Sequence, residues 1–235
     1  MKKLLLVAAV LFSFQFAVAS DTTPEESLQV IYGGQLYDKW FKVAPNAKTP
    51  KDTHAAYPQD GKYKGNATWR CKECHGWDLK GKDGGYAKGK HFTGIKGLQD
   101  YAGKPIAEIA KVITNDTHAY KGLLGEKEVN ALALFVSKAQ LDPKTYVDGK
   151  TPKGDKVHGA KLYNGICVAC HGLEGRNVNV DGDSKEVLVG ELIRSNPVEI
   201  MHKLRFGHPG AKMTELYDLP VQYLTDILAY GQDLK

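Results

Sequence analysis

The chain has 235 residues, enough for one or two domains, and a formal net charge of +5. Without Lys2 and Lys3 of the N-terminal segment the charge is +3 (5 − 2), too small an excess to indicate a nucleic-acid-binding protein. The charge is uneven, because residues 61–111 contain eleven Lys and Arg against five Asp and Glu, and residues 155–235 contain nine against eleven. We interpret the basic segment either as a solvated face or as a docking surface for an acidic partner protein.

The first 19 residues have the three parts of a secretory signal peptide. Lys2 and Lys3 form the charged start, residues 4–16 form an apolar stretch, and residues 17–19 read Ala-Val-Ala, which fits the small-residue cleavage rule. The alternative is a membrane anchor, but the apolar stretch is short for a bilayer span and Gln15 interrupts it. We therefore expect a periplasmic or otherwise exported protein, soluble after cleavage and without a later membrane span.

The first half of the remaining chain predicts three helices. Residues 33–38, Gly-Gly-Gln-Leu-Tyr-Asp, belong to an opening helix, and residues 106–113 form a second helix with Pro105 at its start. Residues 126–138 carry an apolar stripe typical of a third helix. Residues 141–154 contain two prolines and two glycines and show no helical period, which favours a linker.

The second half predicts three further helices, at residues 157–163, 197–206 and 219–234. The middle one has Asn196 or Ser195 as its cap and Pro197 in its first turn. Alternating apolar runs are few, so strands should be rare and the fold class all-α.

The pattern Cys-x-x-Cys-His-Gly occurs at residues 71–76 and again at residues 167–172, a shift of 96. It is the signature of c-type haem attachment, because two thiols on one helical turn can bond one porphyrin while the histidine ligates the iron. The pattern uses all four cysteines of the chain. Two covalently bound haem c groups are therefore expected, held by Cys71, Cys74, Cys167 and Cys170, with His75 and His171 as iron ligands.

A Cys-x-x-Cys pair has two other common uses, as half of a zinc site or as a redox-active thiol pair. A zinc site built from both pairs would have to bridge about 96 residues, and it leaves both trailing histidines unexplained. A thioredoxin-type redox pair needs a βαβ context, and no such pattern surrounds either motif.

The two halves contain similar elements in the same order, but the opening helix of the first half lies much farther from its cysteine motif. Residues 33–38 resemble residues 159–164, yet Tyr163 precedes its first cysteine by four residues, whereas Tyr37 precedes Cys71 by thirty-four. We infer an insertion at about residues 41–67, which a surface excursion tolerates because loop-closure entropy grows slowly with length. The alternative is that residues 33–38 match by chance within an unrelated N-terminal arm.

Residues 155–235 resemble a class I cytochrome c domain. The resemblance rests on Gly-Ala-Lys-Leu-Tyr at residues 159–163, on the motif at 167–172, and on a methionine before a C-terminal amphipathic helix. It implies a small all-α fold around one haem, and hence two tandem domains of this kind. We divide the chain into a signal peptide at 1–19, a first domain at 20–140, a linker at 141–154 and a second domain at 155–235.

The resemblance implies a second axial ligand for each iron. In the second domain it points to Met213, which precedes the last helix, although Thr214 replaces the usual following proline. The competing residues are His208 and Met201, and Met201 lies inside a predicted helix.

The first domain offers only histidines as second ligands, because residues 20–200 contain no methionine. His118 is favoured, since shifting Met213 back by 95 residues reaches it. His54, in the insertion, and His91, in a glycine-rich loop, are the alternatives, as is an open site. The aromatic residues Trp69 and Trp77 flank the first motif and are expected to pack near the porphyrin or in the core.

These features favour an electron carrier over an enzyme. A His/His haem normally has a lower potential than a His/Met haem, so single electrons would pass from the first haem to the second. One alternative is a dihaem oxidoreductase, such as a peroxidase or a sulfur-compound-oxidising cytochrome, which needs an open or labile iron site. Another is the haem subunit of a larger dehydrogenase, with the insertion as interface.

Overall fold

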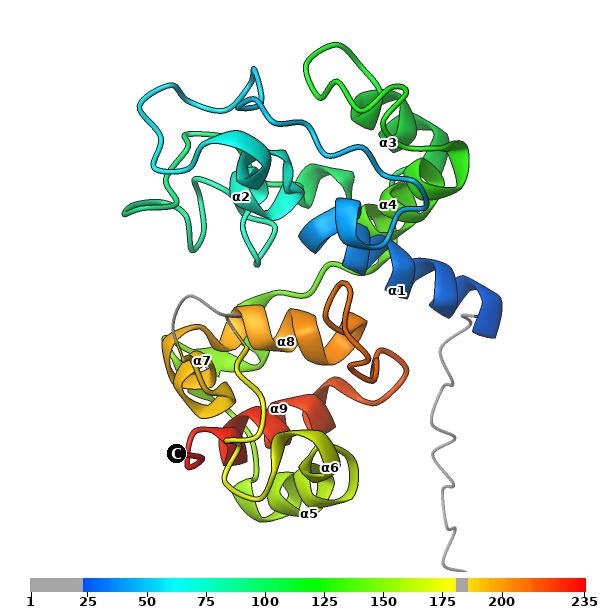
Figure 1. Cartoon of the computed structure of the whole chain (residues 1–235). Coiled ribbons are helices and arrows are strands. Elements are labelled where there is room, and N and C mark those ends of the chain that lie inside the picture. Colours follow the sequence, from blue (N-terminus) through cyan, green and yellow to red (C-terminus); the bar gives the residue numbers. More distant parts are fainter. Residues whose placement is uncertain (1–22, 181–185) are drawn as a thin grey trace, which may run out of the picture.

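A computed structural model describes residues 23–180 and 186–235 of the chain. The signal peptide predicted at residues 1–19 lies outside these ranges. The described residues form nine α-helices, a few 3-10 turns and one two-stranded sheet, arranged as an upper and a lower body (Figure 1). The structure is thus mostly helical, as the all-α prediction requires. Within the described ranges, no helix is long and apolar enough to cross a membrane.

The upper body contains α1 (Pro24–Lys39), α2 (Cys71–His75), α3 (Ile106–Ile113) and α4 (Glu126–Lys138). Helix α1 begins at Thr23, whose hydroxyl accepts the Glu26 N–H, with a proline in the first turn. It packs lengthwise on α4 through a core of large side chains. The helices approach closely because Gly33 faces the Ala131 carbonyl, where any Cβ would overlap it.

The lower body contains α5 (Lys156–Ile166), α6 (Val168–His171), α7 (Val189–Ser195), α8 (Pro197–Phe206) and α9 (Val221–Gly231). Helix α5 packs on α9 as α1 packs on α4, and Gly159 faces the Asp226 carbonyl with equally little room for a Cβ. A core of aliphatic side chains lies beneath α7, α8 and α9. Both bodies are therefore built on the same glycine-mediated helix crossing.

The helix boundaries predicted for α3, α4 and α8 are confirmed residue for residue. The Asn196 side chain caps α8 by accepting the Glu199 N–H at 3.3 Å. Helices α1 and α5 extend beyond the residues expected, α9 is shorter, and α7 was missed. The expected linker contains a 3-10 turn (Pro143–Thr145) and the hairpin of β1 (Val147–Asp148) and β2 (Thr151–Pro152), with Val147 opposite Pro152.

A tyrosine of the opening helix is bonded to the Cys-x-x-Cys-His-Gly motif in each body. The Tyr37 hydroxyl donates to the Gly76 carbonyl at 2.6 Å, and the Tyr163 hydroxyl donates to the Gly172 carbonyl at 2.8 Å. Tyr37 thus occupies in the upper body the place that Tyr163 has in the lower one, although about 30 more residues separate it from its motif. Those residues run as an irregular excursion with the 3-10 turns Trp40–Lys42 and Gly65–Trp69.

The two bodies meet where α8 packs on α1. Phe206 fills the space beside Gly34, and the His202 Nε2–H donates to the Gly34 carbonyl at 2.9 Å. Lys203 forms an ion pair with Asp38, and both side chains are almost completely buried. Because these contacts are buried, the two bodies pack directly against each other and are not joined by the linker alone.

We predict that Lys203→Met destabilises the protein by about 3 kcal/mol, because it leaves a buried carboxylate short of one partner. The methionine keeps most of the apolar stem, so that the loss reports on the charge. The exposed pair Lys156–Asp233 offers a matched control, and Lys156→Met should cost less than about 1 kcal/mol. Urea unfolding of the purified variants measures both values, and equal midpoints would contradict the buried-pair argument.

Candidate functional site

The first motif opens onto a cavity of about 390 Å³, within the range of about 300–1,000 Å³ that small-molecule and cofactor sites occupy. Helix α2 supplies both cysteines and the adjacent histidine from little more than one turn. The other walls come from α1, α3, α4, the loops at residues 95–101 and 117–120, and the inserted segment, which contributes His54 and Ala56. Most of the lining is apolar, including Leu98, Tyr101, Ile109, Val112, Ile113, Leu132 and Val136.

The imidazole of His75 is oriented by a backbone carbonyl. Its Nδ1 lies 2.9 Å from the Lys96 oxygen, and because a carbonyl can only accept, Nδ1 carries the proton. The Nε2 lone pair is therefore left for another partner. Burial lowers the pKa of His75 to about 4, which keeps the ring neutral at neutral pH.

His118 lies opposite His75 across this cavity. The ring centroids are 6.3 Å apart and the ring planes differ by 20°. The Nδ1 of His118 lies 3.2 Å from the Asn115 side-chain oxygen, which also accepts the His118 backbone N–H at 3.0 Å. Burial is the main cause that lowers the pKa of His118. Two neutral imidazoles thus have their Nδ1 atoms engaged by acceptors outside the ring pair.

The donor set of this cavity fits a haem. An imidazole nitrogen bound to a first-row metal lies about 2.0 Å from it, so two rings on opposite sides of one ion have centroids roughly 6 Å apart. The His75–His118 separation has that value, and Cys71 and Cys74 line the same cavity. Burial raises the pKa of Cys71 to about 11 and that of Cys74 to about 12, so both are thiols at neutral pH rather than thiolate ligands.

The two alternative histidines have both ring nitrogens engaged elsewhere. His54 accepts the Ala56 N–H at Nδ1 (3.1 Å), and its Nε2 lies 2.9 Å from the His118 carbonyl oxygen. His91 contacts Glu73 at Nδ1 (3.2 Å) and the Tyr63 hydroxyl at Nε2 (3.3 Å). Of the three candidate partners of His75, His118 is the one whose ring faces the His75 ring across the cavity.

The second motif has the same backbone geometry. The Gly172 N–H donates to the Val168 carbonyl at 2.8 Å, as the Gly76 N–H does to Lys72 at 3.0 Å. Cys167 is half-buried and Cys170 is exposed. The Nδ1 of His171 is buried and has no hydrogen-bonding partner within the described residues, and burial lowers the pKa of this histidine. Such an unpartnered buried nitrogen indicates a group or water beside it.

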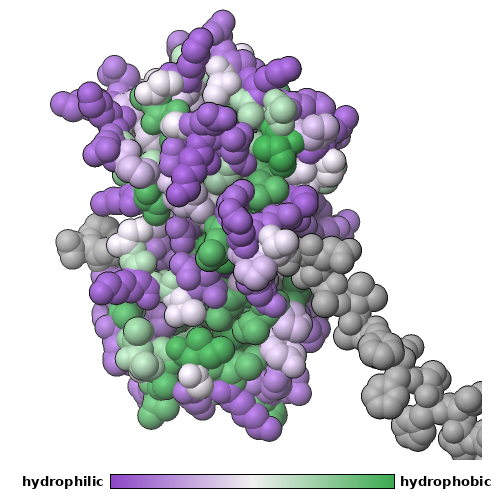
Figure 2. Space-filling model, turned by 90° about the vertical axis from the view of Figure 1, so that its right-hand side faces the viewer, coloured by the Kyte–Doolittle hydropathy of each residue, from purple (hydrophilic) through white to green (hydrophobic). Residues whose placement is uncertain are grey.

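The candidates for the second axial position of this motif differ in burial. Met213 lies in the loop between α8 and α9 and is half-buried against the lower core. Met201 is 2% exposed within that core, whereas His208 is exposed. Large apolar side chains beside the motif face solvent, with Leu173 71% exposed. Figure 2 shows apolar side chains gathered on the lower body of the molecule.

Trp77 is buried but does not line the cavity, which agrees with the expected place in the core rather than with the alternative near the porphyrin. The ammonium groups of Lys72 and Lys203 lie 5.1 Å and 5.2 Å from its ring, and the ring of His202 lies 5.1 Å away. Trp69 instead packs edge-on against His54, with centroids 4.3 Å apart. The glycine that follows His75 turns the chain, which directs Trp77 toward the lower body.

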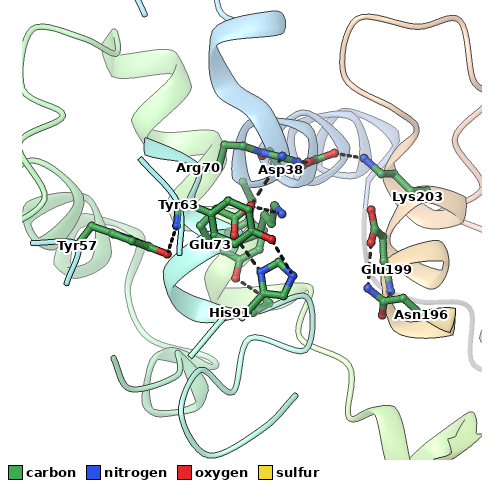
Figure 3. Close-up of polar contacts among 12 residues, drawn as sticks. Asp38, Tyr57, Tyr63, Arg70, Glu73, His91, Asn196, Glu199 and Lys203 are labelled. Atoms are coloured by element: carbon green, nitrogen blue, oxygen red, sulfur yellow. Dashed lines mark hydrogen bonds and ion pairs between the residues drawn. The ribbon is translucent and has the colours of Figure 1, made fainter. Parts of the chain in front are cut away.

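A cluster of buried charges, which sequence reasoning missed, lies behind α2 at the contact with α8 (Figure 3). In it the Arg70 Nε–H donates to the Asp38 carbonyl at 2.7 Å, and the Asn196 side-chain amide donates to Glu199 at 2.9 Å. Acidic and basic members are equal in number, which offsets the cost of burying each. The interface charge cluster comprises Asp38, Arg70, Lys72, Glu73, Glu199 and Lys203.

Burial and the neighbouring positive charges shift the pKa values of the carboxyl groups in this cluster in opposite directions. Burial alone would raise the pKa of Asp38, but Lys203 and Arg70 outweigh it and hold that pKa well below its usual value. Burial raises the pKa of Glu199, since Lys203 and Lys72 only partly offset it. Lys72 and Glu73 stand between the two cysteines of the first motif and form an ion pair with each other. Lys72 also interacts electrostatically with Glu199 of α8, and this interaction links α2 to the interface.

Within residues 23–180 and 186–235, no three His, Cys, Asp or Glu side chains gather as a metal-binding group. The two cysteine pairs lie in opposite bodies of the molecule (Figure 1), which disfavours a zinc site built from both. No family model matches the chain.

We predict that the buried histidine of the interface makes the protein sensitive to acid. Burial lowers the pKa of His202 to about 3, whereas an unfolded chain has a histidine pKa of about 6.5. As the pH falls below 6.5 the unfolded state therefore takes up the proton first, and stability is lost between pH 6.5 and 3 at up to about 1.4 kcal/mol per pH unit.

The groups that act on His202 are Asp38, Lys203 and Arg205. His202→Gln retains a donor for the Gly34 carbonyl but cannot titrate. Urea unfolding between pH 6.5 and 4 should give a smaller pH dependence for His202→Gln than for the wild type. Equal slopes would show that other groups carry the acid sensitivity.

Proposed function

We propose that this protein is an exported, periplasmic dihaem c-type cytochrome that relays single electrons between partner proteins. The proposal includes two tandem domains resembling class I cytochrome c, each with one covalent haem. Cys71 and Cys74 would hold the first haem, with His75 and His118 as iron ligands. Cys167 and Cys170 would hold the second, with His171 and Met213 as ligands.

The observation that carries this proposal is the pair of facing imidazoles in a cavity lined by two cysteines. The bound haem would supply the one-electron redox change. The protein's own residues exclude water with an apolar wall and hold two neutral imidazoles in place through Lys96 and Asn115. With both axial positions filled by protein, a substrate has no free position at the iron, which favours a carrier over an enzyme.

The difference between the axial ligands sets the direction of transfer. A thioether ligand raises the potential of a haem relative to a second imidazole, so electrons run from the first haem to the second. The donor would then dock on the upper body. Exposed lysines there suit an acidic partner protein, whereas Arg70 and Lys72 of the same segment are used in buried pairs. In the basic segment 61–111 the exposed lysines are Lys62, Lys64, Lys82, Lys88, Lys90, Lys96, Lys104 and Lys111.

We predict that the exported protein carries two covalent haems and lacks residues 1–19. Mass spectrometry of protein produced with a haem-attachment system should show both changes, and a pyridine haemochrome assay should count two haems per chain. Replacing Cys71 and Cys74 by alanine should remove one haem and leave the other. A single haem in the wild type would contradict the proposal for the second motif.

We predict that His118→Gly opens the first iron to added ligands, because a glycine leaves the cavity without its second imidazole. The reduced variant should bind carbon monoxide, and added imidazole should restore the six-coordinate spectrum of the oxidised form. Met213→Ala is the matched control in the other domain. It should remove the thioether charge-transfer band in the near infrared and lower only the potential of the second haem.

Carbon monoxide binding by the reduced wild-type protein distinguishes an electron carrier from an enzyme. If reduced wild-type protein binds carbon monoxide readily at the first haem, the site is open or labile, and a dihaem oxidoreductase becomes the better proposal. If Met201→Ala rather than Met213→Ala removes the near-infrared band, the ligand of the second haem is Met201.

A further inference from the structure

The inserted segment places one histidine in the cavity wall beside the loop that bears His118. His54 is 7% exposed, and its Nδ1 accepts the backbone N–H of Ala56. The proton must therefore be on Nε2, which lies 2.9 Å from the His118 carbonyl oxygen. Since a carbonyl can only accept, the two contacts agree on one neutral tautomer, which donates to the backbone of His118.

The His118 loop needs such support because its backbone is strained. Ala119, the next residue, has a φ of +57°, a left-handed conformation that residues with a Cβ adopt only at a cost. It persists where surrounding contacts fix it. Those contacts are the Ala119 N–H to the Asn115 carbonyl (2.8 Å), the Tyr120 hydroxyl to the Trp69 carbonyl (2.6 Å), and His54.

His54 is itself held rigidly within the insertion. Its backbone N–H donates to the Thr68 hydroxyl at 2.9 Å, and its ring packs against Trp69. The Trp69 carbonyl accepts from Tyr120 and also from the Trp40 indole at 2.9 Å. The inserted segment is thus anchored to the chain on both sides of its histidine, and it presents a fixed donor to the His118 carbonyl.

We propose that His54 is a positioning residue that keeps the His118 imidazole directed at His75 and slows its release from the iron. This inference rests on the proposed function of the first cavity. It gives the insertion a role, namely to hold the loop that bears His118 in place. His54 acts through the backbone of His118 and does not touch the iron itself.

Two substitutions separate the two contacts of His54. In His54→Asn the shorter side chain can still accept the Ala56 N–H but cannot reach the His118 carbonyl. In His54→Gln the longer amide can donate to that carbonyl and has no imidazole with which to ligate iron. His91→Ala is the matched control, because His91 also has both nitrogens engaged in the upper body but lies outside the cavity.

The measurement is the rate at which carbon monoxide binds to the first haem of the dithionite-reduced, dihaem protein, followed by stopped-flow spectroscopy. We expect His54→Asn to bind about tenfold faster than the wild type, as the loss of one hydrogen bond allows. His54→Gln and His91→Ala should bind at the wild-type rate. Electron paramagnetic resonance of the oxidised variants should keep the low-spin signal of two imidazoles in all three.

Each contrary result overturns a different statement. If His54→Asn binds carbon monoxide at the wild-type rate while His118→Gly binds it readily, the positioning role of His54 is wrong and the proposed function stands. If both His54→Asn and His54→Gln lose the two-imidazole signal, His54 is the iron ligand and the inference is wrong. If the wild type binds as fast as His118→Gly, the proposed axial ligation by His118 fails.

Discussion

The structure depends on the buried carboxylate of Asp38. It receives Arg70, which directly precedes the first motif, and Lys203, which comes from the last third of the chain. A single buried anion thus joins the opening helix, the motif helix and the lower body. Removing one partner of a buried ion pair destabilises a protein by more than the intact pair stabilises it. Separating these three parts would leave Asp38 without its partners, so they retain one arrangement. The positions of the walls of the cavity beside Cys71 depend on that arrangement.

The two bodies share a plan but differ around their motifs. Both have the glycine crossing and the tyrosine bonded to the motif glycine. In the upper body the residues between the cysteines are buried and paired, and a carbonyl orients the histidine; in the lower body His171 has no such partner within the described residues. The upper site is the more enclosed of the two. On the proposed function, this asymmetry parallels the different axial ligands of the two irons.

Sequence reasoning succeeded where the determinants are local. Helices with a sustained apolar period and a proline at their start, such as Pro197–Phe206, had the correct boundaries. Helix α7 was missed because it has seven residues and its start depends on Glu191 reaching back to the Leu188 N–H. The repeat shift pointed to His118, but the contact of His54 with it spans 64 residues, and that of His202 with Gly34 spans 168. Such contacts follow from packing, and no short-range pattern encodes them.

The separation of Asp38 from Lys203 by 165 residues has a consequence for biogenesis. In a chain synthesised from its N-terminus, the residues of the upper body precede those of α8. Until α8 docks, the charged surface of α2 that faces the interface stays exposed to solvent, so its burial is a late step. A truncated chain that stops before residue 203 would keep this polar surface and the apolar face of α1 uncovered.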